Sequence, residues 1–293
     1  MDTSSTGGGT GSRPSAVTRR TIDTGTVRLA VLESGAGGHP LLVLHGFCGA
    51  KENFEEQMAP LARLGFHVVA PDQRGHGRSD HPKGTTAYGF ARFVDDALEL
   101  ADRLGWDRFA LLGHSMGGMT AQRLALAHPE TLTGLVLMDT SHRPPEMDRG
   151  LIEAGRQIVR SSGMKGLVEA LREMGGPLVT EAQLRLLERR PGYQEQLDAQ
   201  TLVVSEDMWI SMSTEMFTSE DLLEDLRHMD VPTLVMVGEE DAPFLDASRR
   251  MADAIAKAEL AVIEGAGHSP QLEAPDTWLE ALARFLGTLL DAA

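Results

Sequence analysis

The chain has very little cysteine: Cys48 is the only one among its 293 residues. A disulfide within the chain needs two cysteines, so none can form here. The sequence therefore does not require an oxidising compartment. Cys48 falls in a loop beside Phe47, where we expect a small packing residue rather than a nucleophile.

Long apolar runs are also missing. No stretch reaches about 18 apolar residues, so we expect no transmembrane helix. The start of the chain is rich in glycine, serine and threonine and lacks the apolar core of a signal peptide. No apolar stretch follows Arg19 and Arg20, as a twin-arginine signal would require. We expect residues 1–16 to form a flexible tail and the protein to be cytoplasmic.

Positive charge is scarce as well, because 27 Lys and Arg stand against 43 Asp and Glu, a formal net charge of −16. This balance argues against nucleic acid and against an anionic membrane surface as partners. An acidic balance of this kind is typical of soluble proteins, and it does not identify a substrate. Hydrophobic residues make up 42% and charged residues 24%, as in an ordinary globular chain. The length suits one large α/β domain with an insertion, or two domains.

Strand-like and helix-like segments alternate along most of the chain. Residues 18–33 alternate apolar and polar positions, which predicts one or two antiparallel edge strands. Buried strands are predicted at residues 41–44, 66–70, 109–112, 135–138, 233–237 and 260–263. Strands that alternate with helices favour a mostly parallel central sheet with helices on both faces.

The alternation breaks in the middle of the chain. Residues 141–228 contain no strand-like run, only short helix-like pieces separated by glycine, serine and proline at residues 161–163, 175–177 and 191–192. We therefore expect residues 17–140 and 229–293 to form the α/β core and residues 141–228 to form a helical cap. Sites in open α/β sheets lie beyond the carboxyl ends of the strands, so the cap would cover the site.

One segment combines a strand, a tight turn and a helix around a serine. Residues 109–112 are apolar, residues 113–117 read Gly-His-Ser-Met-Gly, and a helix-like segment follows. The G-x-S-x-G pattern in this setting lifts the Ser115 hydroxyl clear of the backbone. The helix N-terminus behind it favours developing negative charge. These features predict Ser115 as a catalytic nucleophile.

A serine hydroxyl needs a base within hydrogen-bond reach, and the base needs an orienting acid. His268 follows the last predicted strand and is flanked by small residues, so it is the candidate base. Asp241 follows the strand at residues 233–237 and is the candidate acid. Asp139 also ends a strand and remains the alternative acid.

Five motifs together resemble the α/β-hydrolase superfamily over about residues 18–290. They lie at residues 45–47, 72–79, 113–118, 238–241 and 267–268. The resemblance implies the α/β-hydrolase fold, with Ser115 as nucleophile, His268 as general base and acid, and Asp241 as its orienter. It also implies that the backbone N–H groups of Phe47 and Met116 form the oxyanion hole.

The resulting expectation is a cofactor-free serine hydrolase that cleaves a small to medium carboxylic ester or lactone through an acyl-enzyme on Ser115. Superfamily members with aspartate at this position include epoxide hydrolases and haloalkane dehalogenases, so serine argues against both. One alternative is hydrolysis of a carbon–carbon bond in a vinylogous diketone; that branch often has an aromatic residue after the histidine, where this chain has Ser269. A cofactor-free perhydrolase and a non-enzymatic ligand receptor are the others.

No pair of histidines occurs at metal-binding spacing with an acidic partner, so we expect no metal site. The stretch from Gly75 to Gly77 lacks the strand–turn–helix context of a nucleotide site. The expected partner is a small ester-type molecule, and the sequence does not indicate the oligomeric state.

An apolar stripe in the cap region has two interpretations. Met208, Trp209 and Met212 recur at near-helical spacing, and Met216 and Phe217 continue the pattern. The stripe fits a cap core, and it also fits one wall of an apolar acyl pocket in which flexible methionine tolerates varied substrates.

Overall fold

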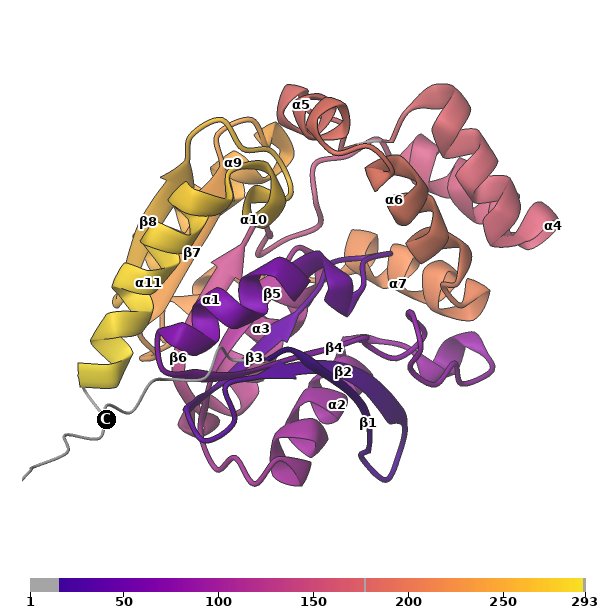
Figure 1. The fold of residues 1–293 in the computed structure, drawn as a ribbon. Coiled ribbons are helices and arrows are strands. Elements are labelled where there is room, and N and C mark those ends of the chain that lie inside the picture. The colour runs from indigo at the N-terminus through magenta and orange to yellow at the C-terminus, as the bar shows by residue number, and fades with distance from the viewer. Residues whose placement is uncertain (1–15, 177, 292–293) are drawn as a thin grey trace, which may run out of the picture.

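The chain folds around a single eight-stranded sheet, which a computed structural model describes for residues 16–176 and 178–291 (Figure 1). Apart from Ala16, the tail predicted for residues 1–16 lies outside the described residues. The strands in chain order are β1 Thr18–Asp23, β2 Arg28–Ser34, β3 His39–Leu44, β4 Phe66–Pro71, β5 Phe109–His114, β6 Leu132–Met138, β7 Thr233–Gly238 and β8 Ala258–Ile263.

The spatial order of the strands is β1-β2-β4-β3-β5-β6-β7-β8. β1 pairs with β2 and β2 with β4 in antiparallel fashion, whereas all other neighbours are parallel. The chain moves outward from β3 to β4 and then returns to β5 on the other side of β3. This reversal is the topological switch point of an open α/β sheet, where ligands bind.

Helices fill the connections between the strands. The α-helices are α1 Glu55–Arg63, α2 Phe90–Arg103, α3 Met116–Ala127, α4 Arg149–Met174, α5 Glu181–Arg189, α6 Tyr193–Leu202, α7 Glu206–Thr218, α8 Leu223–Leu226, α9 Ala242–Ala254, α10 Pro270–Glu273 and α11 Pro275–Asp291. Short 3₁₀ turns occur at Lys51–Phe54, Thr85–Ala87 and Pro129–Thr131. Within the described part of the chain, no helix is both long and apolar enough to cross a membrane.

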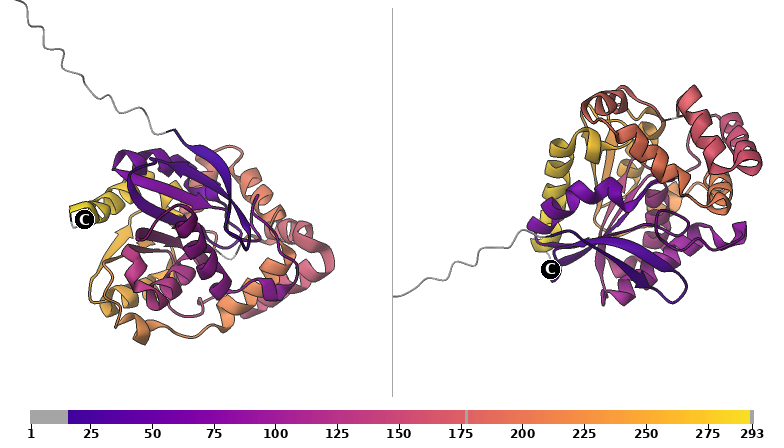
Figure 2. Two further views of the ribbon diagram at one scale, coloured as in Figure 1. Left: turned by 90° about the horizontal axis from the view of Figure 1, so that it is seen from below. Right: turned by 45° about the vertical axis from the view of Figure 1, so that its right-hand side comes forward.

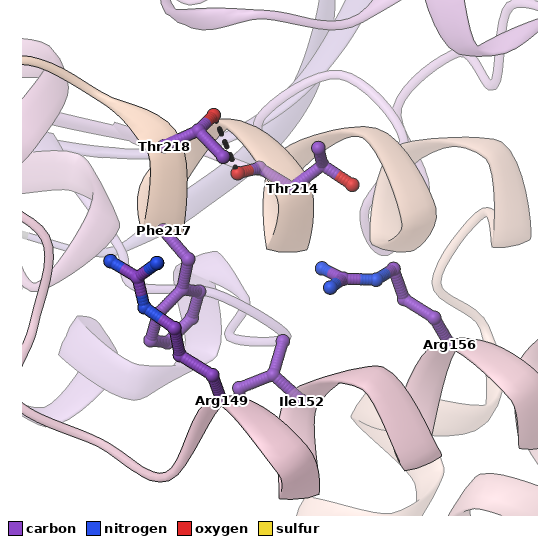
Figure 3. A pocket seen from close by; sticks show the side chains of 6 residues that line it. All are labelled: Arg149, Ile152, Arg156, Thr214, Phe217 and Thr218. Atoms are coloured by element: carbon purple, nitrogen blue, oxygen red, sulfur yellow. Dashed lines mark hydrogen bonds between the residues drawn. The ribbon is translucent and has the colours of Figure 1, made fainter.

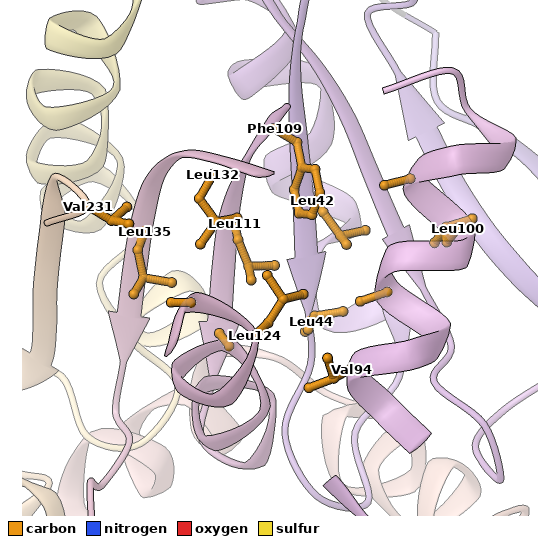
Figure 4. Close-up of a cluster of buried hydrophobic side chains, with 14 of the residues drawn as sticks. Leu42, Leu44, Val94, Leu100, Phe109, Leu111, Leu124, Leu132, Leu135 and Val231 are labelled. Atoms are coloured by element: carbon orange, nitrogen blue, oxygen red, sulfur yellow. The ribbon is translucent and has the colours of Figure 1, made fainter. Parts of the chain in front are cut away.

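Side chains of the central strands alternate between two hydrophobic layers. Leu42 and Leu44 of β3 join the layer formed with α2, α3 and α9 (Figure 4). Leu41 and Val43 of the same strand join the layer formed with α1 and α11. Residues 41–44 of the strand are buried on both faces, which explains their unbroken apolar sequence. The predicted mostly parallel sheet with helices on both faces is confirmed.

Helices α4 to α8 form the whole connection between β6 and β7, and α4 to α7 gather at one end of the sheet (Figures 1 and 2). The predicted break at residues 161–163 is a bend inside α4, where Gly163 has φ 67° and ψ −170°. The predicted breaks near Gly175 and Gly192 do separate helices. The division into core and cap at residues 141 and 228 stays a prediction.

Candidate active site

Ser115 stands on a sharp turn between β5 and α3. Its backbone has φ 53° and ψ −116°, a conformation that costs a non-glycine residue about 1–3 kcal/mol. Two hydrogen bonds hold it there: Ser115 N–H donates to the carbonyl of Met138 (2.9 Å), and the Thr140 hydroxyl donates to the carbonyl of Ser115 (2.7 Å). The turn is thus anchored to the end of the neighbouring strand β6.

The flanking glycines are required by close backbone approach. A Cβ atom on Gly117 would lie 2.4 Å from the carbonyl oxygen of Leu44, and one on Gly113 would lie 2.4 Å from the carbonyl oxygen of Gly117. Real Cβ atoms do not approach backbone oxygen so closely, and backbone cannot move aside as a flexible side chain can. The G-x-S-x-G spacing is therefore set by packing of α3 against β3 and β5.

A chain of hydrogen bonds joins the three predicted residues. Ser115 Oγ lies 3.0 Å from His268 Nε2, and His268 Nδ1 lies 2.8 Å from Asp241 Oδ2. Asp241 is fully buried, and the His268 side chain is 14% exposed. A carboxylate can only accept, so Nδ1 carries the proton and the lone pair of Nε2 faces the hydroxyl. In this arrangement the imidazole can take the serine proton.

The two predicted oxyanion donors flank the same serine. Met116 is the first residue of α3, and the first N–H groups of a helix have no partner within that helix. Phe47 follows Gly46, and a Cβ on Gly46 would lie only 3.1 Å from Ser115 Cβ. The loop after β3 therefore runs beside Ser115, at the topological switch point.

His45 braces this loop from behind. Its Nδ1–H donates to the Gly46 carbonyl (2.8 Å), and its Nε2 accepts the backbone N–H of Gln73 (3.0 Å). Both bonds require a neutral ring with the proton on Nδ1. Burial lowers the pKa of His45, which keeps the ring neutral.

A second buried carboxyl lies behind the histidine. Asp139 follows β6, is fully buried and has φ 46°. Its Oδ1 accepts the backbone N–H of Gly238 at 2.8 Å, and one of its oxygens lies within 4.8 Å of an oxygen of Asp241. Burial and the neighbouring Asp241 raise the pKa of Asp139 well above its usual range. Of the two candidate acids, the structure pairs Asp241 with His268.

Two residues, Glu273 and His114, hold the loop that carries His268. Neither was singled out from the sequence for this role. Glu273 Oε2 accepts the backbone N–H groups of Gly267 (2.6 Å) and Ser269 (3.2 Å), on either side of His268. The side chain of Glu273 is buried, and burial raises its pKa. The Ser-to-Glu spacing here is four residues, whereas the capping-box pattern has three, so that pattern does not reveal the contact.

His114 supports the same loop from the serine side. Its Nε2–H donates to the carbonyl of His268 at 2.7 Å. Burial and the neighbouring His268 lower the pKa of His114 to about 3, so the ring is neutral. The residue before the serine therefore fixes the backbone of the candidate base.

The apolar stripe of α7 lies over this site. Met208, Trp209 and Met212 are buried in one hydrophobic cluster with Met116, and Phe47 packs against that cluster. The ring centroids of Phe47 and Trp209 are 5.6 Å apart. These contacts fit both the cap-core and the acyl-pocket interpretations.

Cys48 packs against the same cluster of side chains. Burial raises the pKa of its thiol to about 12, so the reactive thiolate is disfavoured at neutral pH. This setting agrees with the predicted packing role.

A separate pocket lies between α4 and α7 (Figure 3). It is lined by Arg149, Ile152, Arg156, Thr214, Phe217 and Thr218. Neither Ser115 nor His268 contributes to its lining.

Within the described ranges, one group of acidic and histidine side chains could hold a metal ion by proximity. The ligand atoms of Asp139, Asp241 and His268 lie within 4.8 Å of one another. His268 and Asp241 already use such atoms for their mutual hydrogen bond. The expected absence of a metal stays a prediction.

Comparison with known proteins identifies the family. A family model described as alpha/beta hydrolase fold matches residues 39–275. A 2-hydroxymuconate semialdehyde hydrolase from Pseudomonas sp. (strain CF600) is 31% identical over 274 residues, which cover 91% of this chain and 93% of that protein. Epoxide hydrolase A from Mycobacterium tuberculosis is 35% identical over 130 residues, but the match spans 44% of this chain and only 40% of that protein.

Solved structures agree with this assignment. The enol-lactonase from Burkholderia xenovorans LB400 has a TM-score of 0.79 and 26% sequence identity, over 92% of this chain and all of that chain. Its similarity extends across the sheet and the inserted helices alike, because almost the whole chain is covered. The chain belongs to the α/β hydrolase family.

Proposed function

We propose that this protein is a serine hydrolase that cleaves a small to medium carboxylic ester or lactone through an acyl-enzyme on Ser115. The observation that carries the proposal is the continuous chain of hydrogen bonds from Ser115 through His268 to Asp241. A nucleophile, a base and an orienting acid at these distances suit acyl transfer. The similarity to an enol-lactonase, which acts on a cyclic ester, supports this substrate class.

In the proposed mechanism, His268 takes the proton of Ser115 Oγ while the oxygen attacks the carbonyl carbon. The N–H groups of Phe47 and Met116 donate to the oxyanion, and loss of one such donor typically costs about 10²–10³ in rate. His268 then gives its proton to the leaving alcohol, which leaves an acyl-enzyme. A water molecule, deprotonated by His268, attacks this ester and releases the acid. Asp241 stabilises the imidazolium formed in both steps.

A second candidate reaction is hydrolysis of a carbon–carbon bond in a vinylogous diketone. The specific observation in its favour is the similarity to a 2-hydroxymuconate semialdehyde hydrolase along nearly the whole chain. The same three side chains would serve that reaction. The cytoplasmic location and a small ester-type molecule as partner stay predictions.

A paired assay separates these candidates. Wild type and Ser115→Ala are run on p-nitrophenyl esters of increasing acyl length and on a ring-cleavage dienoate, with Ser161→Ala as an exposed-serine control. We expect rapid ester turnover that disappears only in Ser115→Ala. Strong dienoate cleavage with feeble ester turnover would favour the carbon–carbon reaction. Ester turnover that persists in Ser115→Ala would refute the nucleophile.

We also propose that the buried stripe of α7 limits the acyl side of the substrate. Trp209 packs against Phe47, whose N–H is a proposed oxyanion donor. Trp209→Leu is expected to move the optimum of the ester series to longer acyl chains. Trp106→Leu is the matched control, because Trp106 is equally buried but packs against His67 and Phe109 in the core. An unchanged optimum in Trp209→Leu would favour a role in the cap core alone.

A further inference from the structure

The hydrogen bonds of the two buried aspartates leave one oxygen on each without a donor. Asp241 Oδ2 accepts from His268 Nδ1, and Asp139 Oδ1 accepts from Gly238 N–H. Asp241 Oδ1 and Asp139 Oδ2 are buried and have no hydrogen-bond partner among the described residues. The two carboxyl groups are nevertheless neighbours, because one oxygen of Asp139 lies within 4.8 Å of one oxygen of Asp241. A single proton between them satisfies both remaining oxygens.

The surroundings of Asp139 determine which carboxyl holds that proton. The titratable groups that face Asp139 are Asp241 from the loop after β7, Glu273 from α10 and His268 from the loop after β8. Asp241 accepts the Nδ1–H of His268, a ring that becomes a cation when it takes the serine proton, whereas Asp139 accepts a backbone N–H. Two adjacent carboxylates in a buried site cannot both ionise without a large cost.

The backbone fixes the position of Asp139. Its N–H donates to the Met236 carbonyl at 2.9 Å, and its φ of 46° is retained without glycine. Strained conformations of this kind persist where surrounding contacts enforce them. The side chain is therefore held against Asp241 from the end of β6.

We propose that Asp139 is a neutral positioning residue whose Oδ2–H donates a hydrogen bond to Asp241 Oδ1 and holds the Asp241 carboxylate toward His268. This inference rests on the proposed function, because it concerns the same hydrogen-bond chain. Asp139 touches neither the substrate carbonyl nor Ser115; it acts through Asp241. Loss of its proton places two negative charges side by side and misaligns the acid that orients His268.

The test uses Asp139→Asn and Asp139→Ala in the full chain. An asparagine amide N–H can still donate to Asp241, and its carbonyl can still accept from Gly238, so it mimics the protonated acid. We expect Asp139→Ala to lower kcat for a p-nitrophenyl ester about tenfold or more, as loss of a hydrogen bond to a charged group implies. Asp139→Asn should rescue most of that loss, and it should lack the alkaline decline in kcat that we expect of wild type.

A second readout does not depend on turnover. Infrared difference spectra of wild type against Asp139→Asn at neutral pH should contain the C=O stretch of one protonated carboxylic acid. Its absence would overturn the inference even if the protein had no activity on esters, and its presence would support the inference in that case. Failure of Ser115→Ala to remove turnover would refute the proposed function instead.

Two kinetic results would also overturn the inference. Equal losses in Asp139→Asn and Asp139→Ala would show that a negative charge on Asp139 is needed. Activity retained in Asp241→Asn but lost in Asp139→Asn would make Asp139 the acid that serves His268. If Asp139→Ala fails to fold, two comparisons of wild type with Asp139→Asn decide the matter: the alkaline limb of the kcat profile and the infrared band of the protonated acid.

Discussion

Replacing Glu273 by alanine tests how the loop that carries His268 is held. The change removes the acceptor of two backbone N–H groups, those of Gly267 and Ser269. Each buried N–H left without a partner costs about 1–3 kcal/mol, so the two together cost about 2–6 kcal/mol. Part of this is offset because the variant no longer buries a carboxylate, and that burial is what raises the pKa of Glu273. We expect the free energy of unfolding to fall by about 3 kcal/mol, in the lower half of this range.

Thermal unfolding followed by circular dichroism measures this loss. At about 2–4 °C per kcal/mol for a large domain, Tm should fall by about 6–12 °C in Glu273→Ala. Glu273→Gln keeps one acceptor oxygen, so its Tm should lie between those of wild type and Glu273→Ala. kcat should fall in the same order, because the loop positions His268.

The matched control is Glu264→Ala, an exposed glutamate just before the same loop. Its Tm should equal that of wild type. If Glu273→Ala also melted within about 2 °C of wild type, the carboxylate would not be holding the loop and the reasoning would be refuted.

Three further perturbations have defined outcomes. Gly117→Ala pushes a Cβ to 2.4 Å from the Leu44 carbonyl oxygen and should cost about 3 kcal/mol or more in urea unfolding; normal stability would contradict the close approach. Glu215 of α7 accepts Phe90 N–H at the start of α2 (3.1 Å), so Glu215→Gln should lower Tm by about 2–4 °C through loss of charge–dipole attraction, and less at high salt. The raised pKa of folded Asp139 means that the unfolded chain releases this proton near pH 3.8 while the folded chain keeps it. The free energy of unfolding of wild type should therefore fall as the pH rises from 3.8 toward the pKa of Asp139 in the folded chain. Over that interval Asp139→Asn should become more stable relative to wild type, and a stability difference that does not change with pH would contradict this sign.

The alternation of strands and helices could be predicted from the sequence, because a strand that is buried on both faces has a short run of apolar residues, as β3 does. The meeting of Ser115, Asp241 and His268 could be predicted because each follows a parallel strand, and such strands end at one edge of the sheet. The motif resemblance favours Asp241 over Asp139, but strand position alone does not decide between them, since both residues end strands. Only the turn geometry after β7 and β6 decides which carboxyl faces the imidazole.

Other features depend on contacts that local patterns do not encode. The role of Glu273 requires the loop to fold back so that one carboxylate reaches both N–H groups beside His268. The bend at Gly163 was predicted as a break between two helices. A glycine in the left-handed region interrupts helical dihedrals both at a bend and at a helix end, so the glycine alone does not distinguish the two. Whether the chain continues as one bent helix depends on packing against other helices.

The strand order also has a consequence for how the molecule acquires activity. Ser115 and His268 are 153 residues apart in the chain, and their hydrogen bond forms only when β8 lies in place at the far edge of the sheet. Contacts at such separation carry a loop-closure cost that local contacts do not, and topologies rich in them fold more slowly. In the proposed function, a chain still emerging from the ribosome therefore contains its candidate nucleophile Ser115 before its candidate base His268. If the proposed function holds, recovery of hydrolytic activity during refolding requires β8 to have paired with β7.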